Sequence, residues 1–413
     1  MLTVAEALAA IIATVQRGPV VEISLVEGLG QVLAESIVSD LDSPPFDKAL
    51  MDGYALRAAD VADVAERPEL EVIEEVTAGH LPTRTVGTGQ ATRIMTGAPI
   101  PTGADAVVPI EDTDFQAKDH TPLSGRVMIR KSAACRAGQF ILKQGAAVQR
   151  GAQVMTAGRV LRAQEIAALA ELGYARIRVV RRPQLAILAT GDELVPVSET
   201  PGPGQIRNSN EPMLAAQVQQ AGAEAVRLGV ARDNRSALGE SIRTGLKSDF
   251  LLLSGGVSAG KLDLVPSELA AAGVQQVFHK IQMKPGKPLW FGMLPPAEGR
   301  SPCYVFGLPG NPVSSMVCCE LFVRAAIRQW SGLEPAISAP RMARLGHAIS
   351  VSNNRPTYHP ARFDWTAEGP IVSIVDWIGS SDLCATVDAN CMALFPAGDR
   401  EWVAGEMLEI IPW

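Results

Sequence analysis

The sequence predicts a multi-domain fold that combines one α/β domain with smaller, mainly β domains. The chain has 413 residues, which is too long for a single hydrophobic core. From residue 181 to about residue 331, strand-like runs alternate with helix-like runs, as in a doubly wound parallel sheet covered on both faces. Elsewhere, short apolar runs are separated by Gly, Pro and Thr, which is typical of small β domains.

Residues 1–43 and 146–180 are expected to form an extended N-terminal, linking domain. Apolar residues repeat at helical spacing over 7–16 and predict an amphipathic first helix, and short apolar runs follow it. The adjacent Pro44 and Pro45 impose an extended path, so the next domain should begin there. Helical periodicity returns at 156–172.

The next three regions are expected to be a β-rich domain (44–145), the α/β domain (181–331) and a C-terminal β domain (332–413). In the first, β-rich runs lie at 71–76, 90–95, 106–109 and 126–130. In the second, strands are predicted at 184–190, 225–230, 249–254, 274–281 and 303–308, and helices at 211–221, 236–247, 265–272 and 312–331. In the third, alternating runs lie at 357–365, 371–378, 391–395 and 407–411.

The composition excludes several classes of protein. Lys and Arg number 37 against 44 Asp and Glu, so the net charge of −7 offers no basic field to a nucleic acid. The six cysteines include no CxxC pair and the five histidines no HxxxH spacing, which argues against a disulfide scaffold or a structural zinc site. The longest uncharged run, 301–319, contains three prolines that would break a spanning helix. We therefore expect a cytoplasmic protein without a membrane partner.

Three strands of the expected α/β domain end in glycine-bearing loops. These read TGDE at 190–193, SGGVSAG at 254–260 and LPGNP at 308–312. Ligands of doubly wound sheets bind beyond the carboxyl ends of the strands, so the loops are predicted to converge on one cleft. Consecutive backbone N–H groups at Gly255 and Gly256 favour an anion such as phosphate. Each turn alone is more often a tight strand-to-helix connection than a ligand loop, and no Walker lysine or Rossmann spacing is present.

Lysines gather near these loops. Lys280, Lys284 and Lys287 lie around the turn KPGKP at 284–288, where their ammonium groups would suit a phosphate or another oxyanion. The alternative interpretation is a solvated edge strand with ordinary surface lysines.

Carboxylates also follow the predicted strands, with Asp192 and Glu193 after the first, Asp233 after the second and Asp263 after the third. Such groups beside an anion-binding loop suggest Mg²⁺ bridging to phosphate oxygens. Helix caps and surface charges are the competing explanation.

Six motifs together resemble those of the molybdopterin molybdenumtransferase family, which includes the bacterial MoeA enzymes and the E domain of gephyrin. They follow the family's order through nearly the whole chain: PFD (45–47) with MDGYA (51–55), MTGA (95–98) with GADAVV (103–108), TGDEL (190–194), SGGVS (254–258), KPGKP (284–288) and GLPGNPVS (307–314).

The resemblance implies an elongated homodimer of four-domain subunits with a molybdopterin-binding α/β domain. The implied reaction inserts molybdenum from molybdate into adenylylated molybdopterin, depends on Mg²⁺ and releases AMP. A molybdopterin adenylyltransferase is the implied partner enzyme. The turns that carry Asp52 and Thr96 are expected to reach the α/β cleft of the partner subunit.

The resemblance also implies roles for individual residues. The expected catalytic residues are Asp52, Thr96, Glu193 and Asp263, and the expected metal ligands are Asp192, Glu193, Asp233 and Asp263. The expected cofactor-binding residues are Gly191, Asp192, Ser254, Gly255, Gly256, Ser258, Lys280, Lys284, Pro309, Gly310, Asn311, Pro312 and Ser380.

The sequence departs from the family pattern at four places. SAA at 132–134 replaces two usual carboxylates, Lys261 replaces an acid, Pro266 replaces a lysine, and an arginine of the family falls at Pro360. Fewer carboxylates would weaken metal binding. Two alternatives to the transferase therefore stay open: a non-catalytic molybdopterin-binding or scaffold paralogue, and an activity like that of molybdopterin adenylyltransferase.

Overall fold

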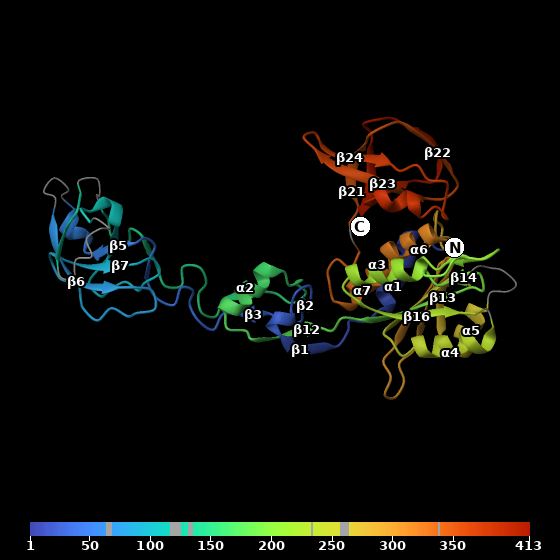
Figure 1. The fold of residues 1–413 in the computed structure, drawn as a ribbon, viewed down its shortest axis with the longest axis horizontal. Coiled ribbons are helices and arrows are strands. Elements are labelled where there is room, and N and C mark those ends of the chain that lie inside the picture. Colours follow the sequence, from blue (N-terminus) through green and yellow to red (C-terminus); the bar gives the residue numbers. More distant parts are fainter. Residues whose placement is uncertain (63–67, 116–124, 131–134, 233, 257–263, 338) are drawn as a thin grey trace. The chain divides into compact units, whose positions relative to one another are not determined.

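The computed structural model describes residues 1–62, 68–115, 125–130, 135–232, 234–256, 264–337 and 339–413. They form two compact units (Figure 1). The first unit comprises Met1–Glu35, Gly158–Ala167 and Ala175–Trp413, and the second comprises Ser36–Ala157 and Ala168–Tyr174. In the described ranges, no helix is long and apolar enough to cross a membrane.

The first unit is built around a six-stranded sheet with the order β16-β13-β17-β20-β19-β18. Every residue of β17 and β20 is buried, as expected for strands covered on both faces. The strands are β13 (Gln184–Thr190), β16 (Glu224–Ala231), β17 (Phe250–Ser254), β18 (Gln275–His279), β19 (Trp290–Leu294) and β20 (Cys303–Leu308).

The prediction of a parallel sheet is correct for four strands and wrong for one edge. β16, β13, β17 and β20 are parallel, whereas β19 runs antiparallel to both β20 and β18. β19 had no counterpart in the sequence prediction. It follows β18 through a short loop rather than a helix, and only antiparallel neighbours can be joined so directly.

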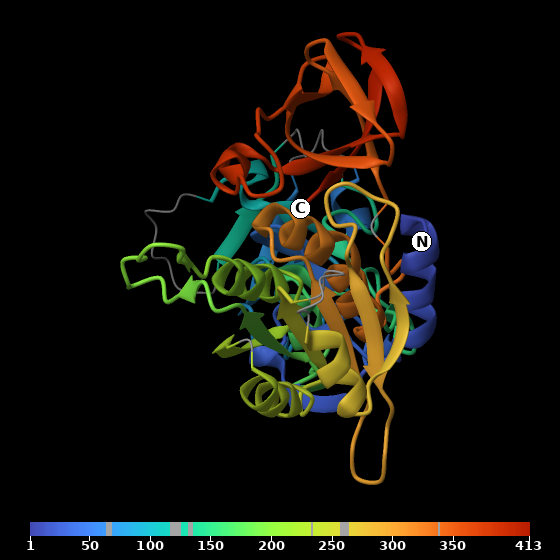
Figure 2. The ribbon, with the colours of Figure 1, turned by 90° about the vertical axis from the view of Figure 1, so that its right-hand side faces the viewer.

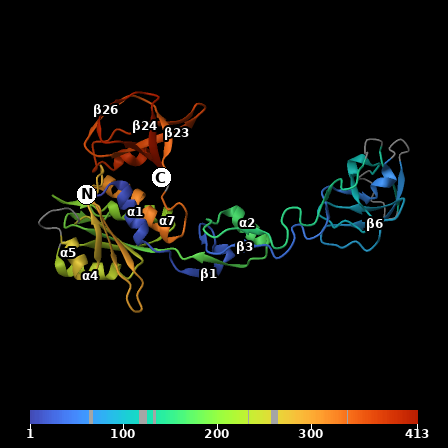
Figure 3. The same cartoon turned by 180° about the vertical axis from the view of Figure 1, so that it is seen from behind.

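Helices cover both faces of this sheet (Figure 1). Leu185 and Ile187 of β13 pack with α1, α3, α6 and α7, whereas Ala186 and Leu188 face the side of α4 and α5. α1 lies beside α7 and starts with a capping box of Thr3 and Glu6 (Figure 3). The bounds are α1 (Val4–Thr14), α3 (Asn210–Gln220), α4 (Arg235–Gly245), α5 (Val265–Ala271), α6 (Pro312–Cys318) and α7 (Arg324–Trp330).

A π-helical turn, Cys319–Val323, joins α6 to α7. The helical run therefore continues from Pro312 to Trp330, as the sequence predicts, but with one widened turn that the sequence pattern did not reveal.

The C-terminal strands form a closed barrel of β21, β24, β23, β25 and β27, and β22 pairs with β26. The barrel lies next to the helices on the α6 side of the sheet (Figures 1 and 2). Its core is separate and includes Phe395 and Trp402. The bounds are β21 (Arg341–Leu345), β22 (Ile349–Asn353), β23 (Thr357–Thr366), β24 (Gly369–Ile374), β25 (Cys391–Phe395), β26 (Gly398–Trp402) and β27 (Met407–Pro412), with a 3-10 helix at Cys384–Asp388.

Two smaller sheets complete the first unit. One has the order β1-β12-β2 and the other is the pair β14-β15. The bounds are β1 (Val20–Ser24), β2 (Val32–Leu33), β12 (Arg176–Val180), β14 (Leu194–Val195) and β15 (Ile206–Arg207), with a 3-10 helix at Leu25–Glu27.

The second unit contains a five-stranded sheet with the order β8-β5-β7-β6-β9 and the short pairs β10-β4 and β11-β3. α2 (Ala163–Glu171) has residues in both units. The strands are β3 (Ile37–Val38), β4 (Lys48–Ala49), β5 (Gly53–Leu56), β6 (Glu69–Val76), β7 (Gln90–Ile94), β8 (Ala106–Pro109), β9 (Gly125–Met128), β10 (Ile141–Leu142) and β11 (Gln153–Met155), with 3-10 helices at Ala58–Val61 and Ile110–Asp112. The predicted α/β plus β fold class is confirmed.

Candidate active site

The order of the sheet strands locates a crevice. From β13 the chain crosses by α3 to β16 on one side, and then by α4 to β17 on the other side of β13. β13 and β17 therefore flank the point where the strand order reverses, and crevices for ligands in open α/β sheets lie at the carboxyl ends of such strands. Ala189 and Ser254 are register partners at those ends.

The loop after β17 is packed directly against Thr190. A side chain at Gly255 would meet the Thr190 carbonyl oxygen at 2.7 Å, and one at Gly256 would meet Val265 Cγ2 at 2.7 Å and Thr190 Oγ1 at 2.9 Å. Both glycines also have positive φ, a backbone conformation that favours glycine. Glycine is therefore required at both positions by the backbone turn and by the lack of space for a side chain. The Gly255 N–H donates to the Leu308 carbonyl at 3.2 Å.

Asn210, the first residue of α3, connects two of the glycine loops. Its Nδ2 group donates to Ser254 Oγ at 2.7 Å and to the Gly310 carbonyl at 2.7 Å. Its Oδ1 atom and the Oγ1 atom of Thr190 are buried without a hydrogen-bond partner in the part of the chain that the structure describes. Buried polar atoms are normally satisfied, so two unpaired oxygens at the ends of these strands are suited to a ligand that donates hydrogen bonds.

The loop after β20 is held from the barrel side. Asn311 Nδ2 donates to Ser380 Oγ at 2.8 Å, and the Val313 N–H donates to the Ser380 carbonyl at 3.0 Å. Ser315 Oγ donates to the Pro309 carbonyl. The predicted site residues Gly310, Asn311 and Ser380 are thus brought together with Ser254 and Gly255, although Ser380 is more than 60 positions away in the sequence.

The acidic loop after β13 keeps its carboxylates at the same end of the sheet. The Glu193 carboxylate lies against Gly191, because a side chain at Gly191 would meet Glu193 Oε2 at 2.4 Å. The Asp192 carbonyl accepts a hydrogen bond from Arg232 at 3.0 Å. Both acidic side chains are exposed.

The lysine turn packs against α6 and the barrel. A side chain at Gly286 would meet Cys318 Sγ at 2.6 Å, and the Tyr358 N–H donates to the Lys284 carbonyl at 2.7 Å. Neither Lys280 nor Lys284 has a carboxylate within 4 Å among the described residues, and the Lys284 side chain is exposed. Burial, together with the nearby Lys284 charge, lowers the pKa of His359.

Asp52 and Thr96 come together in the second unit. The Thr96 N–H and hydroxyl both donate to Asp52 Oδ1 at 2.7 Å. These hydrogen bonds, with a smaller contribution from the Arg93 charge, hold the pKa of the Asp52 carboxyl below its ordinary value. Both side chains are exposed, so a charged carboxylate with a fixed orientation faces solvent.

Several predicted residues lie outside the described residues: the site residues Asp233, Ser258 and Asp263, and the departures at 132–134 and Lys261. Two other departures can be explained locally. Pro266 lies in the first turn of α5, where its missing N–H costs nothing. Pro360 lies in β23, and its carbonyl still accepts a hydrogen bond from the Val375 N–H at 3.3 Å.

Asn210 and the buried Thr190 hydroxyl were missed as individual site residues. The signal for Asn210 is the polar triplet Asn208, Ser209 and Asn210 directly before an apolar helical repeat, a pattern also typical of an ordinary helix cap.

Comparisons with known proteins agree with this arrangement. Residues 2–173 match the MoeA N-terminal region (domain I and II), and residues 186–329 match a probable molybdopterin binding domain. A molybdopterin molybdenumtransferase of Staphylococcus aureus is 33% identical over 99% of this chain and 95% of its own length. One from Nostoc sp. is 41% identical over 74% of this chain and 68% of its own length.

A solved structure gives the same result. The molybdopterin biosynthesis MoeA protein of Pyrococcus horikosii superposes with a TM-score of 0.81 at 31% sequence identity, covering 100% of this chain and 99% of that one. With motif order, fold and full-length relatives in agreement, the chain belongs to the molybdopterin molybdenumtransferase (MoeA) family.

Proposed function

We propose that this chain is a transferase of molybdenum cofactor biosynthesis that inserts molybdenum from molybdate into adenylylated molybdopterin. In this reaction water breaks the phosphoanhydride bond and AMP leaves. The two dithiolene sulfurs replace oxygens of molybdate, and those oxygens leave as water. Family membership at 33% identity over nearly the full length supports the assignment.

One observation of the structure carries the proposal most directly. Asn210 fixes Ser254 and Gly310 relative to each other at the carboxyl ends of β17 and β20. The Gly256 N–H has no acceptor among the described residues, so it can donate to a phosphate oxygen, whereas the Gly255 N–H is already used by Leu308. A rigid polar crevice with a free N–H donor suits the pyrophosphate of the adenylylated pterin.

The residues present fit Mg²⁺. Magnesium is usually held by one or two carboxylates together with substrate phosphates. The loop after β13 carries two exposed carboxylates, Asp192 and Glu193, and that of Glu193 lies against Gly191. When bound, Mg²⁺ would neutralise charge on the phosphoanhydride oxygens. In our proposal Asp233 and Asp263 add to this ligand set.

The lysine turn supplies positive charge for the second substrate. Molybdate is a tetrahedral dianion, and the ammonium groups of Lys280 and Lys284 lack carboxylate partners in the described chain. They would therefore hold molybdate, while Pro309, Pro312 and Ser380 shape the pocket. Electrostatic stabilisation of this kind is strongest where water is excluded.

The turn of Asp52 and Thr96 completes the proposed site from a second subunit. Its carboxylate is exposed, and two hydrogen bonds from Thr96 fix its orientation. We therefore propose a cytoplasmic homodimer, with substrate supplied by a separate molybdopterin adenylyltransferase.

The test is AMP release by the purified protein incubated with adenylylated molybdopterin, molybdate and Mg²⁺. The proposal requires AMP to appear only when all three are present. Stoichiometric binding of the pterin without AMP release would instead indicate the scaffold paralogue. Consumption of ATP with free molybdopterin would indicate an adenylyltransferase.

A further inference from the structure

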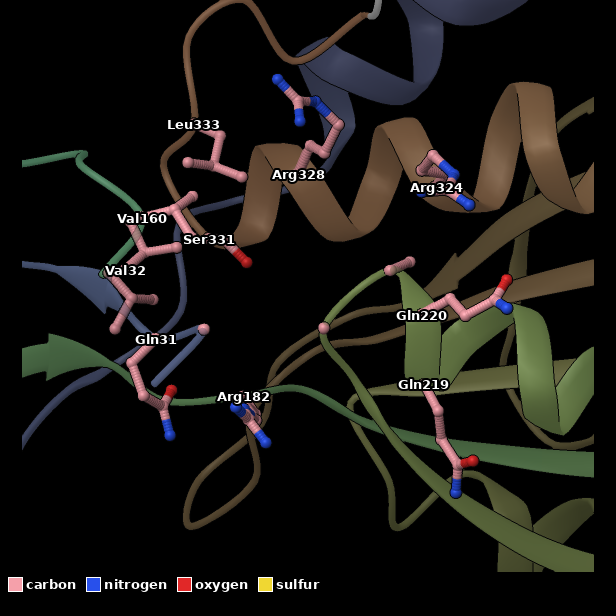
Figure 4. A pocket seen from close by; sticks show the side chains of 14 residues that line it. Gln31, Val32, Val160, Arg182, Gln219, Gln220, Arg324, Arg328, Ser331 and Leu333 are labelled. Atoms are coloured by element: carbon pink, nitrogen blue, oxygen red, sulfur yellow. The ribbon is translucent and has the colours of Figure 1, made fainter. Parts of the chain in front are cut away.

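A separate cavity of about 350 Å³ lies at the other end of α3 (Figure 4). α3 begins at Asn210 in the candidate active site and ends at Gln220 on the cavity wall, and its eleven residues span about 16 Å. The end of α7 and the segments around Val32 and Val180 close the cavity from other sides. The two sites are therefore distinct.

The cavity wall is positively charged. It contains Arg182, Arg324 and Arg328, and none of its fourteen lining residues is acidic. Arg324 pairs with Glu320, which does not line the cavity, at 2.6 Å. Arg182 and Arg328 have no carboxylate within 4 Å among the described residues. In the described chain, the side chains of Arg182 and Arg328 donate to neutral backbone carbonyl groups.

Polar atoms of the wall also lack partners. Arg182 Nε and Gln31 Oε1 are buried without a hydrogen bond in the described chain. Arg182 is held in place by its Nη2 donation to the Leu29 carbonyl at 2.9 Å, which leaves Nε as an unused donor. Burial, and next the Arg324 charge, lower the pKa of Arg328, which is consistent with uncompensated positive charge at this wall.

Helix ends provide further opposing charge. α3 and α7 both end at the cavity, and a helix carboxyl end carries a partial charge of about −0.5. The three guanidinium groups carry three positive charges, and the Glu320 carboxylate compensates one of them. The two helix ends, at about −0.5 each, compensate one more, which leaves a net charge of about +1. The last turns are also closed by their own backbone, with the N–H groups of Gly222 and Gly332 donating to Gln219 and Gln329.

We propose that this cavity binds a small phosphate-type oxyanion, either inorganic phosphate or a small phosphate ester, with Arg182 as its principal donor. Planar guanidinium groups are the preferred partners of phosphate oxygens. The volume is near the lower limit of ligand pockets, about 300 Å³, so a small ligand is expected. The inference does not rest on the proposed transferase function.

The test is calorimetric titration of the full-length protein with inorganic phosphate and, separately, with glycerol phosphate at fixed ionic strength. Arg182→Gln should weaken binding at this site about tenfold or more, because a hydrogen-bonded charge is lost. Gln220→Glu should also weaken it, because a carboxylate is added to the wall at an exposed position where folding is not at risk. Tighter binding of the ester than of phosphate would identify an ester as the ligand.

Arg150→Gln is the matched control, because it removes the same charge from an exposed site in the second unit. It should leave the affinity unchanged. The active-site loops can bind phosphate independently of the cavity. A molar equivalent of phosphate that still binds to both cavity variants is therefore assigned to the active-site loops. The proposal is overturned if the wild-type protein binds neither phosphate nor glycerol phosphate at a site whose affinity falls in both Arg182→Gln and Gln220→Glu. It is also overturned if Arg150→Gln lowers the affinity by the same factor.

Discussion

Asn210 and Gly255 determine the shape of the crevice through two different physical effects. The Asn210 amide joins two loops by hydrogen bonds from one nitrogen atom to Ser254 and Gly310. Gly255 instead provides space, because no side chain could fit between it and the Thr190 carbonyl. The consequences of replacing each residue should therefore differ.

Replacing Asn210 should affect turnover more than folding. Asn210→Ala removes both donated hydrogen bonds, so stability should fall by about 1–3 kcal/mol and kcat/KM for AMP release by about tenfold or more. Asn390→Ala is the control, because Asn390 exchanges two hydrogen bonds with Phe363 inside the barrel. It should lower the melting temperature similarly and leave turnover intact. Equal loss of rate in both variants would contradict the role of Asn210.

Adding a methyl group at Gly255 should displace the loop. Gly255 and Gly229 both have positive φ (+96° and +79°), but only Gly255 has neighbours that an added Cβ would strike. Each Gly→Ala variant should lose about 1–2 kcal/mol of stability through backbone strain. Only Gly255→Ala should also lose AMP release, by about tenfold or more. Unfolding curves and rates for the pair measure this, and matching rates would rule out the steric argument.

At the level of elements, the sequence was most informative where strands are buried on both sides. β13 and β20 have the predicted bounds, because apolar runs bounded by Pro, Gly or charged residues leave little choice of ends. β19 and β5 were not predicted. β19 interrupts the alternation of strands and helices, and β5 lies in a motif, MDGYA, that reads equally well as a turn.

The start of α2 should give a measurable pH dependence. Glu165 accepts hydrogen bonds from Arg159 and from the Arg162 side chain and backbone, and those from Arg162 lower its pKa from 4.5 to about 2. A lowered pKa stabilises the folded state above pH 4.5, and this contribution disappears as the pH falls toward 2. Glu165→Gln should therefore lower the melting temperature at pH 7, with a difference that shrinks between pH 4.5 and 2. A difference that is constant with pH would show that charge is not responsible.

For the whole molecule, the sequence predicted which loops meet better than it predicted how they are held. The meeting of Ser254 and Gly310 follows from the general position of crevices in α/β sheets, whereas the place of Ser380 was expected only from the family resemblance. The Asn210 amide that joins Ser254 to Gly310, and the use of the Gly255 N–H by Leu308, depend on tertiary packing that no local pattern encodes. The arginine-lined cavity was also unpredicted, because its residues come from five separated segments.

Mixing inactive subunits tests whether the active site is shared. If the protein is the proposed homodimer, the Asp52→Asn and Glu193→Gln proteins should each be nearly inactive. If Asp52 serves the partner's crevice, every mixed dimer regains one intact site. Random exchange makes half of the dimers mixed, so about a quarter of wild-type AMP release should return. Affinity tags on the two variants would show that the subunits exchange. If AMP release does not recover although they exchange, Asp52 and Glu193 either belong to the site of the same subunit or lie outside the active site.

The π turn at Cys319–Val323 has a consequence for how this molecule tolerates insertions and deletions. A widened turn holds one residue more than an α-helical turn, so every later side chain of the run is rotated by about 100° relative to an uninterrupted helix. Loss of a single codon there would restore regular winding and leave Arg324 and Arg328 facing the cavity, because the widened turn already absorbs the extra residue. Trp330 would likewise keep its place against Phe250. The spacing between the glycine loop and the arginines can therefore shorten by one residue at this turn without moving the arginines to another face.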